Sequence, residues 1–207
     1  MDENQPFDPL DYTTLTASVV RELMTRGPYP LPLPNAFPGP GVYALFYVGH
    51  YPPYASIRSP NATLPIYVGK AVPKGARKGV SKMNPQDPAL FERIKEHVES
   101  IDSVPSLSLE DFVCRYLTVV PVWVSLTERF LVSHYQPVWN SCIEGFGNHD
   151  PGKGRHKQKV SWWDTLHPGR HWAQKLTQDR TEQEALEKLK QFVADQNLDS
   201  GNRQSLL

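Results

Sequence analysis

Four segments of the chain repeat apolar residues at the three- and four-residue spacing that places them on one face of a helix. They cover residues 14–26, 88–101, 125–135 and 181–196. A Gly-Pro pair at 27–28 ends the first segment, and Thr181 with Glu184 forms a capping box at the start of the last. The pattern therefore predicts four helices.

Three shorter segments favour strands because aromatic and branched residues follow one another in them. They cover residues 41–48, 65–70 and 112–120. The proline-rich stretch over 27–40 is typical of an extended linker. Residues 49–64 are predicted to form a loop, and the glycine- and aromatic-rich residues 141–180 favour no single element.

The order strand, strand, helix, strand, helix predicts an α+β fold with a small, three-stranded antiparallel sheet flanked by helices. Three regions follow one another: an N-terminal helix and proline-rich arm over 1–40, a core over 41–140, and a C-terminal segment with a closing helix over 141–207. Loops at 49–64 and 71–88 interrupt the core. At 207 residues the chain is expected to form one compact domain.

The composition is that of an ordinary folded protein, with 39% hydrophobic and 21% charged residues. This balance excludes a disordered chain, and no apolar run approaches the roughly 18 residues that a membrane helix needs. The N-terminal residues are acidic and polar, unlike a secretory or mitochondrial signal. With Cys114 and Cys142 as the two cysteines, these features predict a cytoplasmic protein with reduced thiols.

Positive charge is concentrated in two stretches, although the formal net charge is zero. Residues 74–82 and residues 153–159 each contain lysines and arginines and no acid, whereas acidic residues gather near both ends of the chain. Such stretches either form a solvated surface or contact the phosphates of a nucleic acid. Charge alone does not decide between these interpretations.

Two glycine-flanked tyrosines stand on neighbouring predicted strands, in the tripeptides GVY at 41–43 and YVG at 67–69, with Lys70 next. Taken alone, Tyr43 and Tyr67 are ordinary strand residues that pack in a core. Glycine lets a backbone approach another group closely, so a phosphate would have room between the two tyrosines.

Four further polar residues lie in or near the two helices that follow. Arg93 and His97 are four residues apart on one helix face, an arrangement that is common on protein surfaces. Glu128 stands three residues after a serine, where it would complete a capping box. Asn140 follows a proline and is typical of a turn. Taken singly, each residue has a structural explanation.

Taken together, these residues resemble the signature of the GIY-YIG nuclease superfamily over about 41–140. The two tripeptides, the pair Arg93 and His97, and the helix with Glu128 and the later Asn140 occur in the superfamily's order and spacing. The segment between the two tyrosines is longer than usual, which marks it as an insertion. The stretches FGNHDPGKGR and HPGRHWA further resemble the type II restriction endonucleases that cleave CCGCGG.

The resemblance implies hydrolysis of phosphodiester bonds in double-stranded DNA, with Tyr43 as the general base, directly or through water. Either His97 or Lys70 accepts the proton of Tyr43, and Arg93 holds the phosphate and its developing charge. A free tyrosine has a pKa near 10. Positive charges from Lys70, Arg93 and a metal ion are expected to lower the pKa of Tyr43.

The resemblance also makes Glu128 the single protein ligand of one divalent ion. Mg²⁺ suits this role because it keeps most of its waters, and Mn²⁺ is expected to substitute. Tyr67 and Asn140 then position water, phosphate or the neighbouring catalytic groups. The sequence excludes two other nuclease chemistries, since no acid is followed by a lysine two residues later and no cysteine or histidine spacing resembles a zinc site.

Ten residues from the basic stretches and the C-terminal motifs are candidates for DNA contact. They are Arg77, Lys78, Lys82, Asn148, His149, Lys153, Arg155, His156, Lys157 and Arg170. Arg155 and Arg170 lie beside glycines and are the candidates for reading guanine edges, whereas Arg77, Lys78 and Lys82 suit phosphates. The alternative is that all ten only neutralise phosphates. A palindrome needs two cuts related by a two-fold axis, which predicts a homodimer on DNA, or a tetramer.

Three functions are compatible with these residues. A type II restriction endonuclease that cuts a short, GC-rich palindrome is favoured by the C-terminal stretches. A repair or mobile-element nuclease of the same superfamily usually carries a separate DNA-binding domain, for which this chain has little room. A non-catalytic DNA-binding module is disfavoured because Tyr43, Arg93 and Glu128 are all present. The sequence thus predicts a Mg²⁺-dependent endonuclease that acts on DNA, with no membrane partner.

Overall fold

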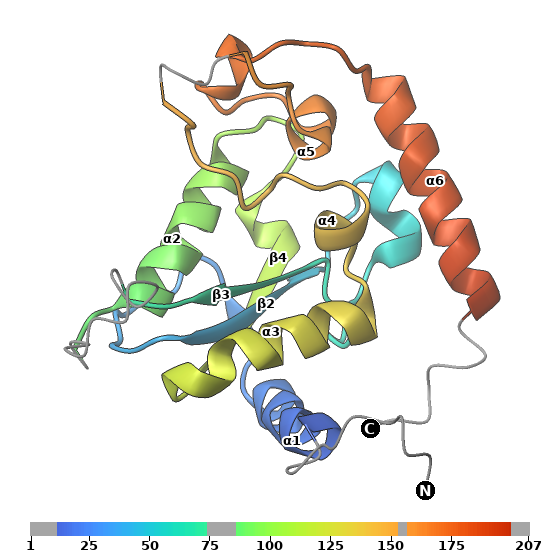
Figure 1. Cartoon of the computed structure of the whole chain (residues 1–207). Coiled ribbons are helices and arrows are strands. Elements are labelled where there is room, and N and C mark those ends of the chain that lie inside the picture. The colour runs from blue at the N-terminus through green and yellow to red at the C-terminus, as the bar shows by residue number, and fades with distance from the viewer. Residues whose placement is uncertain (1–11, 74–85, 153–156, 200–207) are drawn as a thin grey trace, which may run out of the picture.

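Within residues 12–73, 86–152 and 157–199, which the computed structural model describes, four strands form one antiparallel sheet (Figure 1). The strands are β1 Tyr29–Pro30, β2 Gly41–Tyr47, β3 Tyr67–Ala71 and β4 Phe112–Thr118. Their order across the sheet is β1-β4-β2-β3, so β2 lies inside the sheet and β3 lies at one edge.

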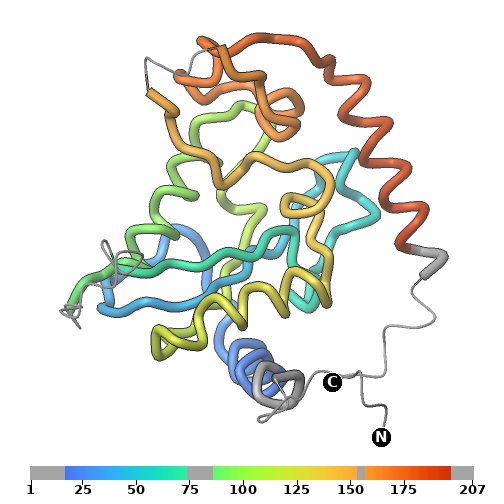
Figure 2. Tube along the Cα trace, viewed as in Figure 1, coloured from blue at the N-terminus to red at the C-terminus, as the bar shows by residue number. Residues whose placement is uncertain are grey.

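Helices cover both faces of the sheet, as the chain trace in Figure 2 also shows. They are α1 Tyr12–Thr25, α2 Ala89–Asp102, α3 Pro121–Tyr135, α4 Val138–Ser141, α5 Trp162–Leu166 and α6 Glu182–Asp199. Three short 3₁₀ helices are η1 Pro52–Ile57, η3 Leu109–Asp111 and η5 Ala173–Lys175. None of the described helices is long and apolar enough to cross a membrane.

Strand β2 is buried along its whole length because apolar residues on both of its faces enter a core. Successive strand side chains point to opposite sides of a sheet. The odd-numbered residues of β2 belong to the core shared with α2, α4, α5 and α6, and the even-numbered ones to the core shared with α1 and α3. The two sets are Tyr43, Leu45 and Tyr47, and Val42, Ala44 and Phe46.

The predicted α+β fold is confirmed, but the expected three-stranded sheet has a fourth strand. Tyr29 and Pro30, inside the proline-rich stretch, pair with Val113 and Cys114 of β4 at the outer edge. Proline is tolerated there because an edge strand leaves some of its N–H positions unpaired. The stretch expected to be a linker therefore contributes to the sheet.

The predicted helices and strands are present, and their ends shift by a few residues. The largest shift is at α3, which begins at Pro121 instead of 125 because proline is well suited to the first turn of a helix. The capping box of α6 is confirmed, since Glu184 Oε2 accepts from the Thr181 N–H at 2.7 Å and the Glu184 N–H donates to Thr181 Oγ1 at 3.2 Å. Cys114 and Cys142 are buried free thiols.

A buried tyrosine–histidine pair joins the 49–64 segment to the C-terminal part of the chain. The hydroxyl of Tyr54, from η1, makes a hydrogen bond with Nε2 of His167 and accepts from Nε1 of Trp139 at 2.9 Å. On the other side of the imidazole ring, Nδ1 of His167 makes a hydrogen bond with Oγ of Ser106 at 2.8 Å. The neutral form of His167 satisfies both contacts.

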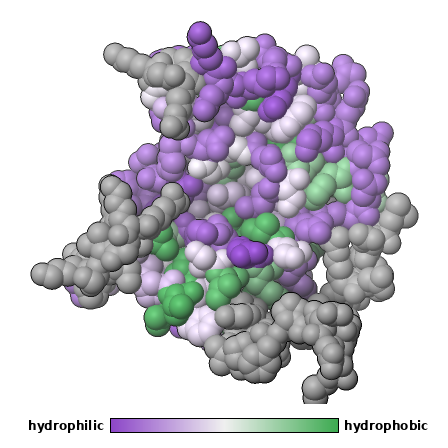
Figure 3. Space-filling view, in the orientation of Figure 1, coloured by the Kyte–Doolittle hydropathy of each residue, from purple (hydrophilic) through white to green (hydrophobic). Residues whose placement is uncertain are grey.

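Hydrophilic residues dominate the face shown in Figure 3 over α5 and α6, and apolar surface gathers near α3. Two exposed apolar residues are Val120 and Val122, at the beginning of that helix, with 65% and 67% of their surface accessible.

Lowering the pH is expected to destabilise the fold through His167. Burial lowers the pKa of this histidine from 6.5 to about 3 in the folded protein. Between these values the unfolded chain binds a proton that the folded chain does not, so the free energy of unfolding decreases as the pH falls from about 6.5 toward 3. Thermal unfolding followed by circular dichroism across this range measures the dependence.

The variant His167→Gln tests the assignment because glutamine does not titrate. We expect a lower Tm than wild type at neutral pH, since the contact with Tyr54 is altered. The loss of Tm on acidification becomes shallower, though it persists because buried His97 also has a lowered pKa. Identical slopes for wild type and His167→Gln would contradict the prediction.

Candidate active site

The phenol ring of Tyr43 lies over the backbone of the edge strand β3, because the residue opposite it has no side chain. Tyr43 pairs with Gly69 in the β2–β3 register, so the two residues share one face of the sheet. A Cβ atom on Gly69 would lie 2.2 Å from Tyr43 Oη, and one on Gly41 would lie 2.1 Å from the Leu117 carbonyl oxygen. The expectation that these glycines make room for a phosphate is therefore wrong, since they make room for protein atoms.

His97 of α2 lies next to Tyr43 and is buried, so the interpretation of His97 as an ordinary surface residue is wrong. The Tyr43 hydroxyl makes a hydrogen bond with Nε2 of His97. The ring of Tyr67, from β3, lies with its centroid 5.1 Å from that of His97 and 6.1 Å from that of Tyr43. The two tyrosines and the histidine thus form one cluster on the α2 face of the sheet.

Phe146 closes this cluster from the C-terminal segment. Its ring stacks on His97 with centroids 4.4 Å apart and meets Tyr67 edge-on at 4.9 Å. The sequence around Phe146 gives no sign that this residue is buried, because it lies in a glycine-rich stretch without periodicity. Its apolar ring keeps water away from the imidazole of His97.

Burial controls the protonation of the Tyr43–His97 pair. It raises the pKa of Tyr43 well above 10, the nearby Tyr67 raises this pKa further, and the charge of Arg93 lowers it without reversing the shift. Burial also lowers the pKa of His97 well below 6.5, with smaller contributions from the charges of Arg93, His149 and Arg170. Both groups are neutral at neutral pH, so the expectation of a lowered Tyr43 pKa is wrong for the protein without DNA or metal.

Arg93, one turn before His97 on α2, lies at the edge of the cluster. Its Nη1 bonds Oε2 of Glu96 at 2.7 Å and Nε2 of His149, and its Nη2 donates to the Gly147 carbonyl at 2.8 Å. The side chain is 20% exposed. Because the guanidinium is held by groups on two segments while still reaching solvent, Arg93 is placed to receive an anion.

Lys70 and Glu128 lie on the opposite face of β3. Lys70 pairs with Val42 in the register, which puts its side chain on the α3 side, and its Nζ lies 2.6 Å from Oε2 of Glu128. Both side chains are partly exposed, at 30% and 23%. Since α3 begins at Pro121, Glu128 stands well inside the helix, and its interpretation as a capping residue is wrong.

Asn140 joins β3 to the short helix α4. Its Oδ1 accepts from the Val68 N–H at 2.8 Å, and its Nδ2 donates to the Val68 carbonyl at 2.8 Å. These two bonds satisfy backbone groups at the edge of the sheet. Asn140 is a helical residue instead of the turn residue considered above, and it holds the strand that carries Tyr67 and Lys70.

The residues from the sequence signature therefore meet around the edge strand β3, on its two faces. Tyr43, Tyr67, Arg93 and His97 lie on the α2 side. Lys70 and Glu128 lie on the α3 side, close enough that the charge of Glu128 adds to the larger effect of burial in raising the pKa of Tyr67.

A metal ion on Glu128 would depend on one carboxylate. Among the residues that the structure describes, no group of three or more histidine, cysteine, aspartate and glutamate side chains forms a metal site. The Glu128 side chain, with 23% of its surface accessible, is partly open to solvent near the β3 edge. Such a site fits Mg²⁺, which takes one or two carboxylates and fills its remaining positions with water and phosphate oxygens.

A pocket of about 260 Å³ opens beside Arg93, between α2 and the C-terminal segment. Side chains of both charges line it, among them Arg93, His149, Glu96, Glu99 and Asp150. These carboxylates disfavour a phosphate in most of the pocket, and one of them, Glu96, already pairs with Arg93, so an anion would have to bind directly against the guanidinium.

The candidate DNA-contacting residues fall into three groups. Asn148, His149 and Lys157 are exposed, the first two at the rim of the pocket beside Arg93. Six of the candidates, which are Arg77, Lys78, Lys82, Lys153, Arg155 and His156, lie outside the described residues. Arg170 is only 4% exposed and has an ion pair with Asp164 at 2.7 Å. The prediction that Arg170 reads bases is therefore wrong, because its side chain is buried and bonded to other groups of the protein.

Comparison with known proteins identifies the family of the chain. No curated protein matches the chain at a significant level. Residues 35–194, more than half of the chain, match the family described as the Eco29kI GIY-YIG domain, a family of restriction enzymes. Nucleases of this kind generally use divalent metal ions. The chain therefore belongs to the Eco29kI family of GIY-YIG restriction-endonuclease domains.

Proposed function

We propose that the protein is a type II restriction endonuclease that hydrolyses both strands of DNA at a short, GC-rich palindrome. The observation that carries the proposal is the meeting of Tyr43, Tyr67, Arg93 and His97 on one face of β3, with Glu128 across the strand. The resemblance of the C-terminal stretches to enzymes that cleave CCGCGG supports that hexamer as the site.

Tyr43 is the proposed general base, with His97 as the acceptor of its proton. The Tyr43 hydroxyl and Nε2 of His97 already share a hydrogen bond, and the proposed role requires the neutral tautomer in which Nε2 is the acceptor. Lys70, the other acceptor considered, lies on the opposite face of β3 and contacts Glu128. The charge of Arg93 favours the phenolate that results.

Arg93 is proposed to bind the scissile phosphate. The guanidinium is partly exposed and stands close to Tyr43 and Tyr67, where the attacking water would meet the phosphorus. A fixed cation that faces the developing negative charge stabilises the transition state without reorganising. Tyr67 lies between Tyr43 and Gly147 and is suited to orient the phosphate or the water.

Glu128 is proposed to hold one Mg²⁺ ion, with Mn²⁺ as a substitute. When bound there, the ion supplies positive charge to the phosphoryl oxygens and the leaving alkoxide. Lys70 pairs with the carboxylate of Glu128, so it would orient this carboxylate and place a second positive charge beside the ion. Asn140 supports both roles indirectly, since it holds β3 by both polar groups of Val68.

Recognition is proposed to come from the exposed C-terminal segment and the two basic stretches. Asn148 and His149 offer hydrogen bonds next to Arg93, and Lys157 is exposed and suits a phosphate. The remaining candidates stay predictions because they lie outside the described residues. Symmetric cleavage of a palindrome further supports a homodimer on DNA, or a tetramer, as the active assembly.

Incubation of the purified protein and Mg²⁺ with a plasmid of known sequence tests the proposed function. Discrete fragments whose ends map to CCGCGG are expected. Nicks that depend on DNA structure would favour a repair or mobile-element nuclease instead. Binding without any cleavage would favour a non-catalytic module and would contradict the enzyme assignment.

Removing the hydroxyl of Tyr43 is expected to abolish most of the activity. Tyr43→Phe keeps the buried ring but loses the proton that His97 accepts, so the cleavage rate should fall by about 10²- to 10⁴-fold. Single-turnover cleavage of a plasmid measures the rate, and a gel-shift assay without metal shows that DNA binding persists.

Tyr54→Phe is the matched control for this variant. It removes the hydroxyl of a second buried tyrosine that is paired with a histidine, His167, outside the site. Both variants should lose stability, on the order of 1 kcal/mol for the hydrogen bond. Tyr54→Phe should still cleave DNA. Near-normal cleavage by Tyr43→Phe would contradict the general-base role and would mean that Tyr43 only packs in the core.

Glu128→Gln is expected to remove metal-dependent cleavage while DNA binding remains. Glutamine keeps the shape of the side chain but lacks the charge that binds Mg²⁺, so the rate should fall by about 100-fold or more. Titration of cleavage with Mg²⁺ and Mn²⁺ measures the effect. Glu22→Gln, which breaks an exposed ion pair with Arg26 at 2.7 Å at the end of α1, serves as control and should cleave normally. Wild-type metal dependence in Glu128→Gln would exclude Glu128 as the ligand.

A further inference from the structure

The backbone at Gly147 lies directly on the candidate active site. The Gly147 carbonyl accepts from Nη2 of Arg93 at 2.8 Å. A Cβ atom on Gly147 would lie 2.6 Å from Tyr67 Oη and 3.3 Å from Arg93 Nη2, so the backbone touches both side chains. His149, two residues later, bonds the other terminal nitrogen of Arg93. The position of Arg93 thus depends on where residues 145–149 lie.

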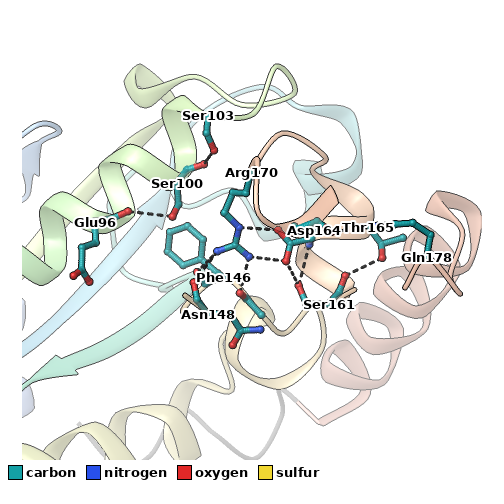
Figure 4. A network of polar contacts seen from close by, with 12 residues as sticks. Glu96, Ser100, Ser103, Phe146, Asn148, Ser161, Asp164, Thr165, Arg170 and Gln178 are labelled. Atoms are coloured by element: carbon teal, nitrogen blue, oxygen red, sulfur yellow. Dashed lines mark hydrogen bonds and ion pairs between the residues drawn. The ribbon is translucent and has the colours of Figure 1, made fainter. Parts of the chain in front are cut away.

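The same segment is held from its other side by Arg170 (Figure 4). Nη1 of Arg170 donates to the carbonyls of Phe146 at 2.9 Å and Asn148 at 3.1 Å, and Nη2 donates to the carbonyl of Gly145 at 2.9 Å. These three carbonyls flank the one that Arg93 uses. A single buried guanidinium therefore sets the path of four consecutive residues that have no regular secondary structure.

Asp164 fixes the guanidinium of Arg170 in turn. Its two carboxylate oxygens accept from Nε and Nη2 of Arg170, both at 2.7 Å, in a fork that is almost completely buried. Trp163 and Trp172 contribute ring faces 4.5 and 4.6 Å from the guanidinium carbon. Ser161, at the start of α5, donates to Asp164 Oδ2 at 2.6 Å.

We infer that the Arg170–Asp164 pair is a positioning device for Arg93, acting through residues 145–148. The inference rests on the role proposed above for Arg93. A buried guanidinium needs hydrogen-bond acceptors for the N–H groups that its ion pair leaves free. Arg170 finds them on three carbonyls of the segment that also carries the Arg93 contact, so the two arginines are joined through one stretch of backbone. Arg170 and Asp164 are positioning residues that do not touch the DNA.

Arg170→Lys and Asp164→Asn test the inference. Lysine keeps the positive charge but cannot reach three carbonyls and a carboxylate at once, and asparagine keeps the shape of Asp164 without its charge. We expect the single-turnover cleavage rate to fall by about 10- to 100-fold, and the loss should persist at protein concentrations that saturate DNA binding as measured without metal. If Arg170→Lys fails to fold, Asp164→Asn carries the test.

A second readout does not depend on cleavage. The NMR order parameter of the Arg93 Nε–H bond, measured on the DNA-free protein labelled with ¹⁵N, reports whether this side chain is held. Both variants are expected to make Arg93 more mobile. An unchanged order parameter would overturn the inference, whatever the cleavage rate.

Arg115→Lys is the matched control for loss of a buried arginine. Arg115 is 8% exposed and also donates to backbone carbonyls, those of Ala62 and Arg26, but it lies on the α1 side of the sheet. The variant Arg115→Lys should lower the Tm without changing the mobility of Arg93 or the cleavage rate. Equal slowing by Arg115→Lys and Arg170→Lys would overturn the inference in favour of a general loss of stability. If Arg93 becomes more mobile in the Arg170 and Asp164 variants while cleavage stays normal, the positioning of Arg93 by this pair would be supported and the catalytic role of Arg93 would be refuted.

Discussion

The register between β2 and β3 is the constraint on which the rest of the site depends. It sets Tyr43 opposite Gly69, and the missing side chain leaves the space that the phenol occupies. A slip of one residue would turn every side chain of β3 to the other face, which would separate Tyr67 from His97 and Lys70 from Glu128. Asn140 secures this register from outside the sheet, because it bonds both polar groups of Val68.

Burial keeps Tyr43 and His97 neutral in the protein without DNA or metal, because it raises the pKa of the phenol and lowers the pKa of the imidazole. Tyr43 and His97 resemble Tyr54 and His167, since in both pairs a buried phenol bonds an imidazole whose pKa is lowered by burial. Arg93 lies beside the first pair, and its charge favours loss of the Tyr43 phenol proton. The proposed difference in reactivity between the two tyrosines therefore depends on charged groups at the edge of β3 and on those that DNA and metal would add.

The C-terminal segment belongs to the site as much as the strands do. Phe146 covers His97, and the Gly147 carbonyl holds Arg93. The segment has little regular structure of its own, so its path depends on side chains that bind its carbonyls. Arg170, expected at the DNA surface, serves this purpose because a guanidinium has enough donors to replace the missing backbone pairing.

The sequence by itself determined the elements and the order of the site residues. Apolar spacing is local, so it predicted α2 and α6 and the strands that carry Tyr43 and Tyr67. Tertiary structure alone decided which charges are buried. Arg170 and the exposed Lys157 look alike in basic, glycine-rich stretches, and only packing distinguishes them. Long-range contacts set the direction of each pKa shift and paired residues 29–30 with β4, because desolvation and strand pairing depend on neighbours far away in the chain.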